Sequence, residues 1–263
     1  MIRVIHKAFD MLEYLAKEPR RRKKLNEISG HLKMNAGTCA NILKTMVQRK
    51  YVDQASVRGG YLLGPMIYYL SRLSAYRGDL ISVAEPLMAN LAKQVNETVL
   101  IALLRSNERF IIIQIDGNQS VQVGRNMFQK DTVYQSATGR LLLAQLNEKE
   151  FNEFIAEEGA PGSRWPEASS LSKLKSELEK IRRRGWVCYK TTHDVVAIAY
   201  PIREKDKSRS DRDKVVAALG LFLPAFRFKG AHKTAIMKGM STAAAAISEC
   251  LSGNGNYDAK SSN

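Results

Sequence analysis

Several features that mark membrane proteins and secreted proteins are missing from this sequence. No apolar run reaches about eighteen residues, so no segment is expected to span a bilayer. The opening residues, 1–7, contain no apolar stretch of the kind found in signal peptides. The cysteines are few and far apart (Cys39, Cys188 and Cys250), which argues against a disulfide framework and is typical of a reducing compartment. We therefore expect a cytoplasmic protein without membrane attachment.

Catalytic and metal-binding motifs are also missing. The 4 histidines are scattered, and no pair has the spacing of metal ligands. No nucleophile elbow, phosphate-binding loop or zinc motif occurs. His193 is followed by Asp194, but adjacent residues of a strand face opposite sides and are poorly placed to relay a proton. Neither an enzyme nor a cofactor is therefore expected; an enzyme would lose turnover when His193 is changed.

Positive charge is what the sequence has in excess. The chain has 41 lysines and arginines against 26 acidic residues, a formal net charge of +15. Residues 1–70 hold 13 of these cations and 5 of the acidic residues, so an excess of +8 lies in about a quarter of the chain. The expected partner is a polyanion, in the first place nucleic acid. No persuasive basic amphipathic helix favours a membrane surface instead.

The N-terminal region has the pattern of three short helices followed by a β-hairpin. The first helix should end before Pro19, and its apolar stripe is Ile5, Ala8, Phe9, Leu12 and Leu15. A second helix is expected around 25–32 and a third over 36–49, followed by strands at 51–54 and 61–63 around a turn at 56–60. This order is that of a winged helix-turn-helix, whose third helix enters the major groove of DNA.

The outer face of the third helix is polar and carries one charge, Lys44. Hydroxyl and amide groups can bind base edges, and a lysine can reach a phosphate. The candidate DNA-contacting residues here are Asn35, Ala36, Gly37, Thr38, Asn41, Lys44 and Thr45. Arg58 at the tip of the wing, with Arg22 and Lys24 of the basic run 20–24, would contact phosphates. Taken alone, the helix also fits a plain amphipathic helix, and the basic run also fits a solvated loop.

The remaining sequence predicts an α+β domain with an antiparallel sheet flanked by helices. An apolar stripe at 66–73 indicates a linking helix that pairs with a second subunit or packs on its own domain. Further helices are expected at 80–95, near 136, 147 and 171, and at 233–251, with strands at 99–104, 110–115, 186–189, 195–203 and 214–223. The predicted domains are a DNA-binding domain (1–64), a linker helix (65–79), an effector-binding domain (80–252) and a disordered tail (253–263). The charged segment 204–213 reads as a solvated hairpin loop.

Five segments, in this order, resemble the IclR family of bacterial regulators. They are 6–12, 38–46, 60–64, 136–144, and the pair 181–186 and 198–202. The resemblance extends from about residue 4 to 250, nearly the whole chain. It implies a GAF-like second domain and a homodimeric or homotetrameric repressor or activator. Such a protein would bind a near-palindromic DNA operator and sense a small organic acid.

The resemblance also implies an effector pocket at the start of the helix Ala137-Thr138-Gly139. Free backbone N–H groups and the helix dipole favour a carboxylate there, with Ser136 as the cap. Departures from the family pattern give the other candidate pocket residues: Tyr189, Lys190, Asp194, Val195, Ala197, Gly220 and Phe222. Met127 in the preceding loop could line the pocket or fill the core.

The substituted pocket predicts a bulkier or aromatic acid, with Lys190 as its counter-ion. The rival hypothesis is a pocket that has lost its ligand, in a non-specific or architectural DNA-binding protein. Such a protein would show little preference for one DNA sequence over another.

Overall fold

The computed structural model describes residues 2–56, 59–73, 78–119, 133–205 and 213–253. Its contacts divide the chain near residue 76 into two compact units, which are described separately below. The predicted roles of Arg58 and Met127 lie outside the described residues. The same is true of the predicted tail beyond Gly253 and of most of the charged hairpin loop.

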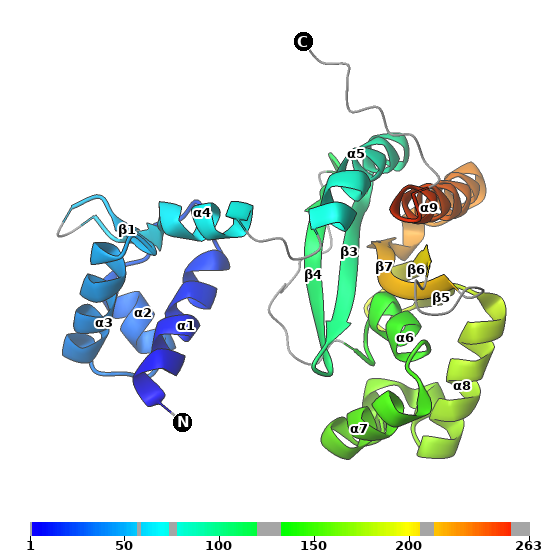
Figure 1. Cartoon of the computed structure of the whole chain (residues 1–263), viewed down its shortest axis with the longest axis horizontal. Coiled ribbons are helices and arrows are strands. Elements are labelled where there is room, and N and C mark those ends of the chain that lie inside the picture. Colours follow the sequence, from blue (N-terminus) through cyan, green and yellow to red (C-terminus); the bar gives the residue numbers. More distant parts are fainter. Residues whose placement is uncertain (1, 57–58, 74–77, 120–132, 206–212, 254–263) are drawn as a thin grey trace, which may run out of the picture. The chain divides into compact units, whose positions relative to one another are not determined.

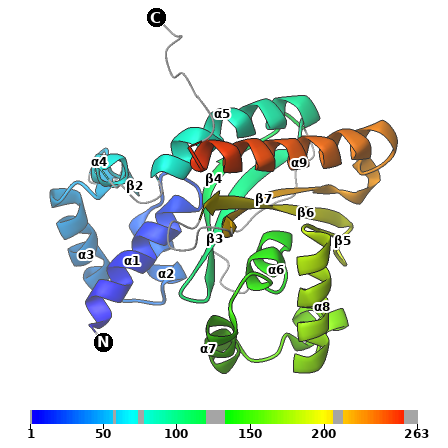
Figure 2. The same cartoon turned by 45° about the vertical axis from the view of Figure 1, so that its right-hand side comes forward.

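The larger unit is built on a five-stranded antiparallel sheet with the strand order β4-β3-β7-β6-β5. Helices cover both faces of this sheet, with α5 and α9 on one face and α6, α7 and α8 on the other (Figures 1 and 2). The strands are β3 (Thr98–Arg105), β4 (Glu108–Ile115), β5 (Val187–Lys190), β6 (Val195–Lys205) and β7 (Asp213–Pro224). The helices are α5 (Gly78–Val95), α6 (Ala137–Leu143), α7 (Glu148–Glu158), α8 (Leu171–Arg184) and α9 (Gly230–Leu251). The predicted order of helices and strands is confirmed, and three short 3-10 segments add to it: η1 (Gly162–Arg164), η2 (Pro166–Ala168) and η3 (Ala225–Arg227).

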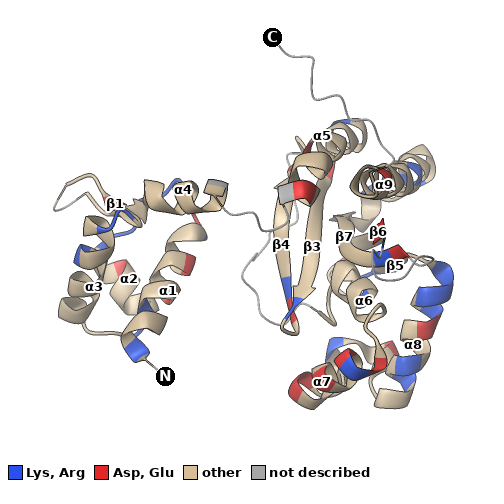
Figure 3. Cartoon of the chain, in the orientation of Figure 1, with Lys and Arg blue, Asp and Glu red and all other residues tan. Residues whose placement is uncertain are grey.

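The two faces of the sheet carry separate apolar clusters because side chains alternate along each strand. Ile101, Ile198 and Leu219 belong to the cluster under α5 and α9. Leu100 and Ala199 belong to the cluster under α6, α7 and α8. Figure 3 shows that the central strands are almost free of charge, whereas α7 and α8 carry charges of both signs. On these two helices of the larger unit, the cations are therefore interspersed with acidic residues.

The smaller unit has the three helices and the hairpin expected of a winged helix-turn-helix. The helices are α1 (Arg3–Ala16), α2 (Leu25–His31) and α3 (Ala36–Gln48), followed by β1 (Val52–Gln54), β2 (Tyr61–Leu63) and α4 (Pro65–Leu73). β1 and β2 pair antiparallel, with Val52 opposite Leu63. The predicted inner face of α3 is buried in the core of the unit at Cys39, Ile42, Leu43 and Met46.

The predicted stripe of α1 is only partly turned inward. Ile5 and Phe9 remain 47% and 58% exposed, whereas Met11 and Leu15 are buried. At about 3.6 residues per turn, Met11 projects roughly 200° away from Phe9. Because the core of the unit is centred on Met11 and Leu15, the N-terminal end of the predicted apolar stripe of α1 lies at the surface.

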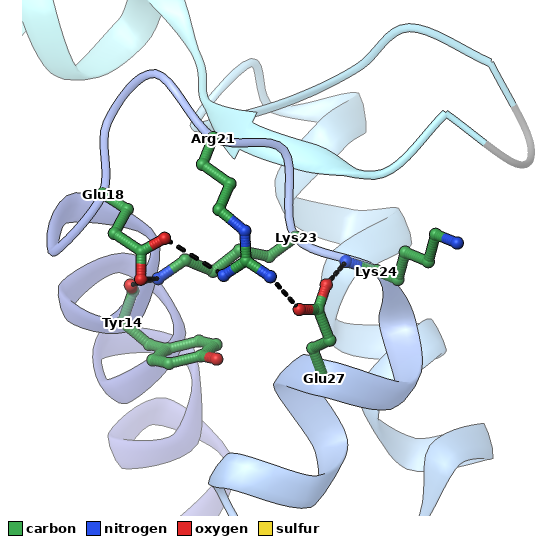
Figure 4. A network of polar contacts seen from close by, with 6 residues as sticks. All are labelled: Tyr14, Glu18, Arg21, Lys23, Lys24 and Glu27. Carbon is green, nitrogen blue, oxygen red and sulfur yellow. Dashed lines mark hydrogen bonds and ion pairs between the residues drawn. The ribbon is translucent and has the colours of Figure 1, made fainter.

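A buried lysine in the basic run ties the loop before α2 to α1 and to the hairpin. Lys23 is 1% exposed, and its Nζ donates to the carbonyl oxygen of Tyr14 at 2.9 Å and lies 3.9 Å from the centroid of the Tyr14 ring. Its backbone pairs with Tyr61 of β2 in both directions, at 3.0 and 2.9 Å. Figure 4 shows Arg21 beside it, bound by both Glu18 and Glu27. Two of the five cations in this run therefore hold the fold together.

Replacing Lys23 should destabilise the smaller unit. The change Lys23→Met removes a charge-assisted hydrogen bond and a cation–π contact, and should lower the free energy of unfolding by about 2 kcal/mol. Hydrogen exchange of the amides in residues 3–63 would measure this loss. The matched control is Lys24→Met, an exposed neighbour, which should change the same free energy by less than about 0.5 kcal/mol. Equal effects of the two changes would contradict a structural role for Lys23.

Candidate functional site

The helix-turn-helix motif is formed by α2, a tight turn and α3. Lys33 in the turn has the left-handed conformation, with φ 48°, and the N–H of Met34 donates to the carbonyl of Ser29 at 3.0 Å. Asn35 caps α3, since its Oδ1 accepts from the N–H of Gly37 at 2.8 Å and from the N–H of Thr38 at 3.4 Å. This oxygen fixes the start of α3, as expected of an asparagine at a helix N-cap.

The predicted outer face of α3 is exposed along its whole length. Its members are Ala36, Gly37, Thr38, Asn41, Lys44, Thr45 and Gln48. The hydroxyl of Thr45 donates to the carbonyl of Asn41 at 3.1 Å, so its hydrogen is used within the helix. This face offers a partner the hydroxyl of Thr38, an acceptor at Thr45, the amides of Asn41 and Gln48, and the ammonium of Lys44.

Cations of the basic run differ in how they are placed. Arg22 is exposed and lies 3.3 Å from the carboxylate of Asp53 on β1, and Lys24 is exposed at the start of α2. The backbone N–H of Lys24 donates to Glu27 at 2.7 Å. Both predicted phosphate contacts therefore remain on the surface, in contrast to Lys23.

Five predicted effector-site residues meet on the α6 face of the larger unit. Tyr189 lies opposite Ala197, and Ala197 lies opposite Phe222, so strands β5, β6 and β7 form one row of side chains. Gly220 lies in the next row, where an added Cβ would be 2.6 Å from the methyl group of Thr138. The sheet and α6 thus bring together residues that are more than eighty positions apart in the chain.

The start of α6 is closely packed. Ser136 accepts from the N–H of Gly139 at 3.1 Å, which confirms its expected role as the cap. All seven residues of α6 are buried. A Cβ at Gly139 would lie 2.3 Å from the carbonyl oxygen of Val133, so only glycine permits this approach.

Two arginines that the sequence analysis missed also reach this face. The Nη1 of Arg109 on β4 donates to the hydroxyl of Thr138 at 3.2 Å. Arg140 is 7% exposed and lies between two rings, 4.1 Å from the centroid of Trp165 and 3.8 Å from that of Tyr189. Its Nε donates to the carbonyl of Tyr134 at 2.7 Å. The position of Arg140, directly after the predicted helix start, could have indicated from the sequence that it belongs to the site. Arg109 lies just before the predicted strand 110–115, and nothing in the sequence connected it with the site.

Burial changes the ionisation of this cluster. It raises the pKa of the Tyr189 phenol above its ordinary value, although the charge of Arg140 acts in the opposite direction. The neutral hydroxyl donates to the carbonyl of Gln135 at 2.5 Å, directly before α6. Burial also lowers the pKa of the Arg140 guanidinium.

Lys190 and Asp194 are not part of this face. Lys190 lies opposite Val196, which belongs to the cluster under α5 and α9, so it projects to the other side of the sheet. There its Nζ lies 2.6 Å from Oδ1 of Asp194, and both side chains are exposed. The interpretation of Lys190 as an effector counter-ion is therefore not supported, because strand alternation turns it away from α6.

The remaining candidates lie near the end of the sheet. Val195 begins β6 opposite Pro224 and has the same orientation as Ala197, on the α6 side. His193 and Asp194 lie in the turn between β5 and β6, so strand alternation does not determine how these two side chains are oriented. The ring Nδ1 of His193 is 3.3 Å from the hydroxyl of Thr192.

Two further features concern the residues that the structure describes. In that part of the chain, no group of three or more His, Cys, Asp or Glu side chains is placed to hold a metal ion. Within the same ranges, no helix combines the length and hydrophobicity needed to cross a membrane.

Comparisons with known proteins match both units. The family model "IclR helix-turn-helix domain" matches residues 4–56, and the model "Bacterial transcriptional regulator IclR C-terminal" matches residues 73–249. Among curated relatives, the HTH-type transcriptional repressor AllR of Escherichia coli (strain K12) is 26% identical over 225 residues, which are 85% of this chain and 80% of the relative.

Solved structures share the fold over almost the full length. An IclR transcriptional regulator from Alicyclobacillus acidocaldarius has a TM-score of 0.72 at 21% identity, covering 97% of this chain and 100% of the other. An IclR homolog from Microbacterium hydrocarbonoxydans, complexed with 4-hydroxybenzoate, has a TM-score of 0.70 at 20% identity, covering 94% and 98%. With one family model on each unit, the chain belongs to the IclR family of bacterial transcriptional regulators.

Proposed function

We propose that this regulator reads an operator with α3 from two subunits, and that a small organic acid bound on the α6 face changes its affinity for that operator. The observation that carries the first part is the exposed polar face of α3. Its side chains offer several hydrogen-bonding groups and a single charged group. This composition suits hydrogen bonds to base edges as well as contacts with phosphates.

The contacts with DNA divide by chemistry. Thr38, Asn41 and Thr45 face the base edges, and an asparagine amide is matched to adenine. Ala36 and Gly37 carry little or no side chain, so the start of α3 can approach closely, while Asn35 keeps that start in place. Lys44 contacts a phosphate. Arg22, Lys24 and Arg58 add further phosphate contacts, which carry the salt dependence of binding.

Substitutions on α3 should separate base reading from phosphate binding. Asn41→Ala should cost about 1–3 kcal/mol on the operator and relax sequence preference, because one base contact is lost. Lys44→Ala should weaken binding to all DNA alike and reduce the salt slope by about one. The measurement is binding to DNA upstream of the protein's own gene and to scrambled DNA of equal length, across a salt series.

Lys149→Ala, an exposed lysine of α7 in the other unit, is the matched control and should change neither quantity. Specific operators are typically bound about a thousandfold or more tighter than random DNA. Equal affinity for both DNAs would favour the architectural alternative.

The proposed effector is an aromatic or otherwise bulky acid. Phe222 and Tyr189 provide an apolar and aromatic floor, and Arg109 and Arg140 supply positive charge in place of Lys190. The backbone at Ala137, Thr138 and Gly139 adds the positive end of the α6 dipole. The complex of one IclR homolog with 4-hydroxybenzoate is consistent with an acid of this kind.

Binding of such an acid should stabilise the protein. At a hundredfold excess over its dissociation constant, the ligand adds about 2.7 kcal/mol, and thermal unfolding would detect this. Arg109→Gln should remove most of the gain, whereas Arg183→Gln, an exposed arginine of α8, should keep it. If no aromatic or aliphatic acid stabilises the wild type, the pocket has lost its ligand, as the rival hypothesis states.

Two-fold pairing would cover the exposed apolar side chains of α1 and α4. Phe9 on α1 and Tyr68 and Leu73 on α4 are 58%, 70% and 65% exposed. Large apolar side chains exposed on two helices of one unit are candidates for an interaction surface. A second copy of the chain is the partner that an operator with two half-sites requires, and pairing would set the spacing of the recognition helices at about 34 Å.

Charges placed on this surface should dissociate the subunits. The double change Phe9→Lys and Leu73→Lys should lower the mass in analytical ultracentrifugation and weaken operator binding, since two half-sites are no longer bound together. Phe226→Lys, an equally exposed phenylalanine of η3, is the control. An unchanged association state of the double variant would refute this interface.

A further inference from the structure

The amide oxygen of Gln114 on β4 has no hydrogen-bond partner. Among the side chains that the structure describes, it is the one buried nitrogen or oxygen atom in this condition. Buried polar atoms are nearly always paired, and leaving one unpaired costs free energy. Each such atom in a native structure needs an explanation, and a ligand that supplies the missing donor is one.

The neighbours of Gln114 determine which of the two polar atoms of its side-chain amide, the oxygen or the nitrogen, is unpaired. Its Nε2 donates to Oδ1 of Asp116 at 2.8 Å, and the hydroxyl of Thr98 points to the same oxygen at 3.3 Å. Turning the amide over would set two acceptor oxygens against each other. The unpaired group is therefore an acceptor, and it requires a donor.

The register of the sheet places Gln114 beside the proposed effector site. It lies opposite Leu100, and Leu100 lies opposite Gly220, so the three share one row on the α6 face. Thr98 lies opposite Phe222 in the adjacent row. With neighbouring strands about 4.8 Å apart, Gln114 lies roughly 10 Å from the glycine beneath Thr138.

We propose that Oε1 of Gln114 accepts a hydrogen bond from the effector, which therefore carries an O–H or N–H donor at the end remote from its acid group. This inference rests on the proposed function of the α6 face. The apolar side chain of Leu100 lies between Gln114 and Gly220, and that of Phe222 lies in the adjacent row of the same face; both suit a ring or a short hydrocarbon segment. A second carboxylate at the remote end is excluded, because it would meet Oε1 and the charge of Asp116.

Matched pairs of acids test this inference on the full-length protein. Each pair differs by the remote donor alone: 4-hydroxybenzoate against benzoate, and 4-hydroxyphenylacetate against phenylacetate, with terephthalate as the diacid. Titration calorimetry should show that the wild type binds the hydroxylated member about ten- to hundredfold more tightly and the diacid most weakly. Gln114→Met should bind both members of a pair alike, while Gln145→Met, an exposed glutamine after α6, should keep the preference.

The outcomes separate this inference from the proposed function. Thermal unfolding and operator binding of Gln114→Met verify that both units of the variant are folded. The preference of the wild type for the hydroxylated acid is measured without any variant. Acids that bind equally well with and without the donor overturn the role of Gln114 but leave an acid-sensing regulator. Tight binding of terephthalate, or a preference that survives in Gln114→Met, overturns it as well. If no acid binds, the inference and the proposed effector fail together, while the operator assay still decides on DNA binding.

Discussion

The alternation of side chains across the antiparallel sheet is the constraint on which the larger unit depends. Strands β3, β6 and β7 are buried on both faces, so a slip of one residue would exchange the two apolar clusters. The same register sets Tyr189, Ala197 and Phe222 in one row and sends Lys190 to the opposite side. The effector site is thus a consequence of pairing between strands that are distant in the sequence.

Charge in this protein acts according to where it is placed. Lys23 and Arg21 belong to the most basic run of the chain, yet one is buried against Tyr14 and the other is held by two carboxylates. Lys24, adjacent to Lys23, is exposed. In the larger unit, Arg140 is buried between two aromatic rings, where cation–π attraction offsets part of the cost of removing the guanidinium from water. Net charge predicts the class of partner, but burial decides which cations can reach it.

The proposed function assigns different physical tasks to the two units. The smaller unit combines the outer face of α3, which carries one charge, with exposed cations on neighbouring segments. Contacts with bases would therefore give preference for a DNA sequence, and contacts with phosphates would give affinity that depends on salt. In the larger unit, two arginines and the acceptor of Gln114 lie on the same face of the sheet as the apolar side chains of Leu100 and Phe222. An acid would alter operator affinity only if it binds more tightly to one of two conformations of the protein, one with high and one with low affinity for the operator.

By itself, the sequence determined the order of helices and strands, the inner face of α3, the cap at Ser136 and the family. These features follow from local periodicity, from capping residues and from motifs in a fixed order, which need no knowledge of distant neighbours. Only the tertiary structure decided that Ile5 and Phe9 are exposed and that Lys23 is buried. It also decided that Arg109 binds Thr138, that Arg140 lies against Tyr189, and that Gln114 shares a row with Gly220. Each of these depends on where the core of a unit is centred or on which residues face each other across strands, and a linear pattern does not contain either quantity.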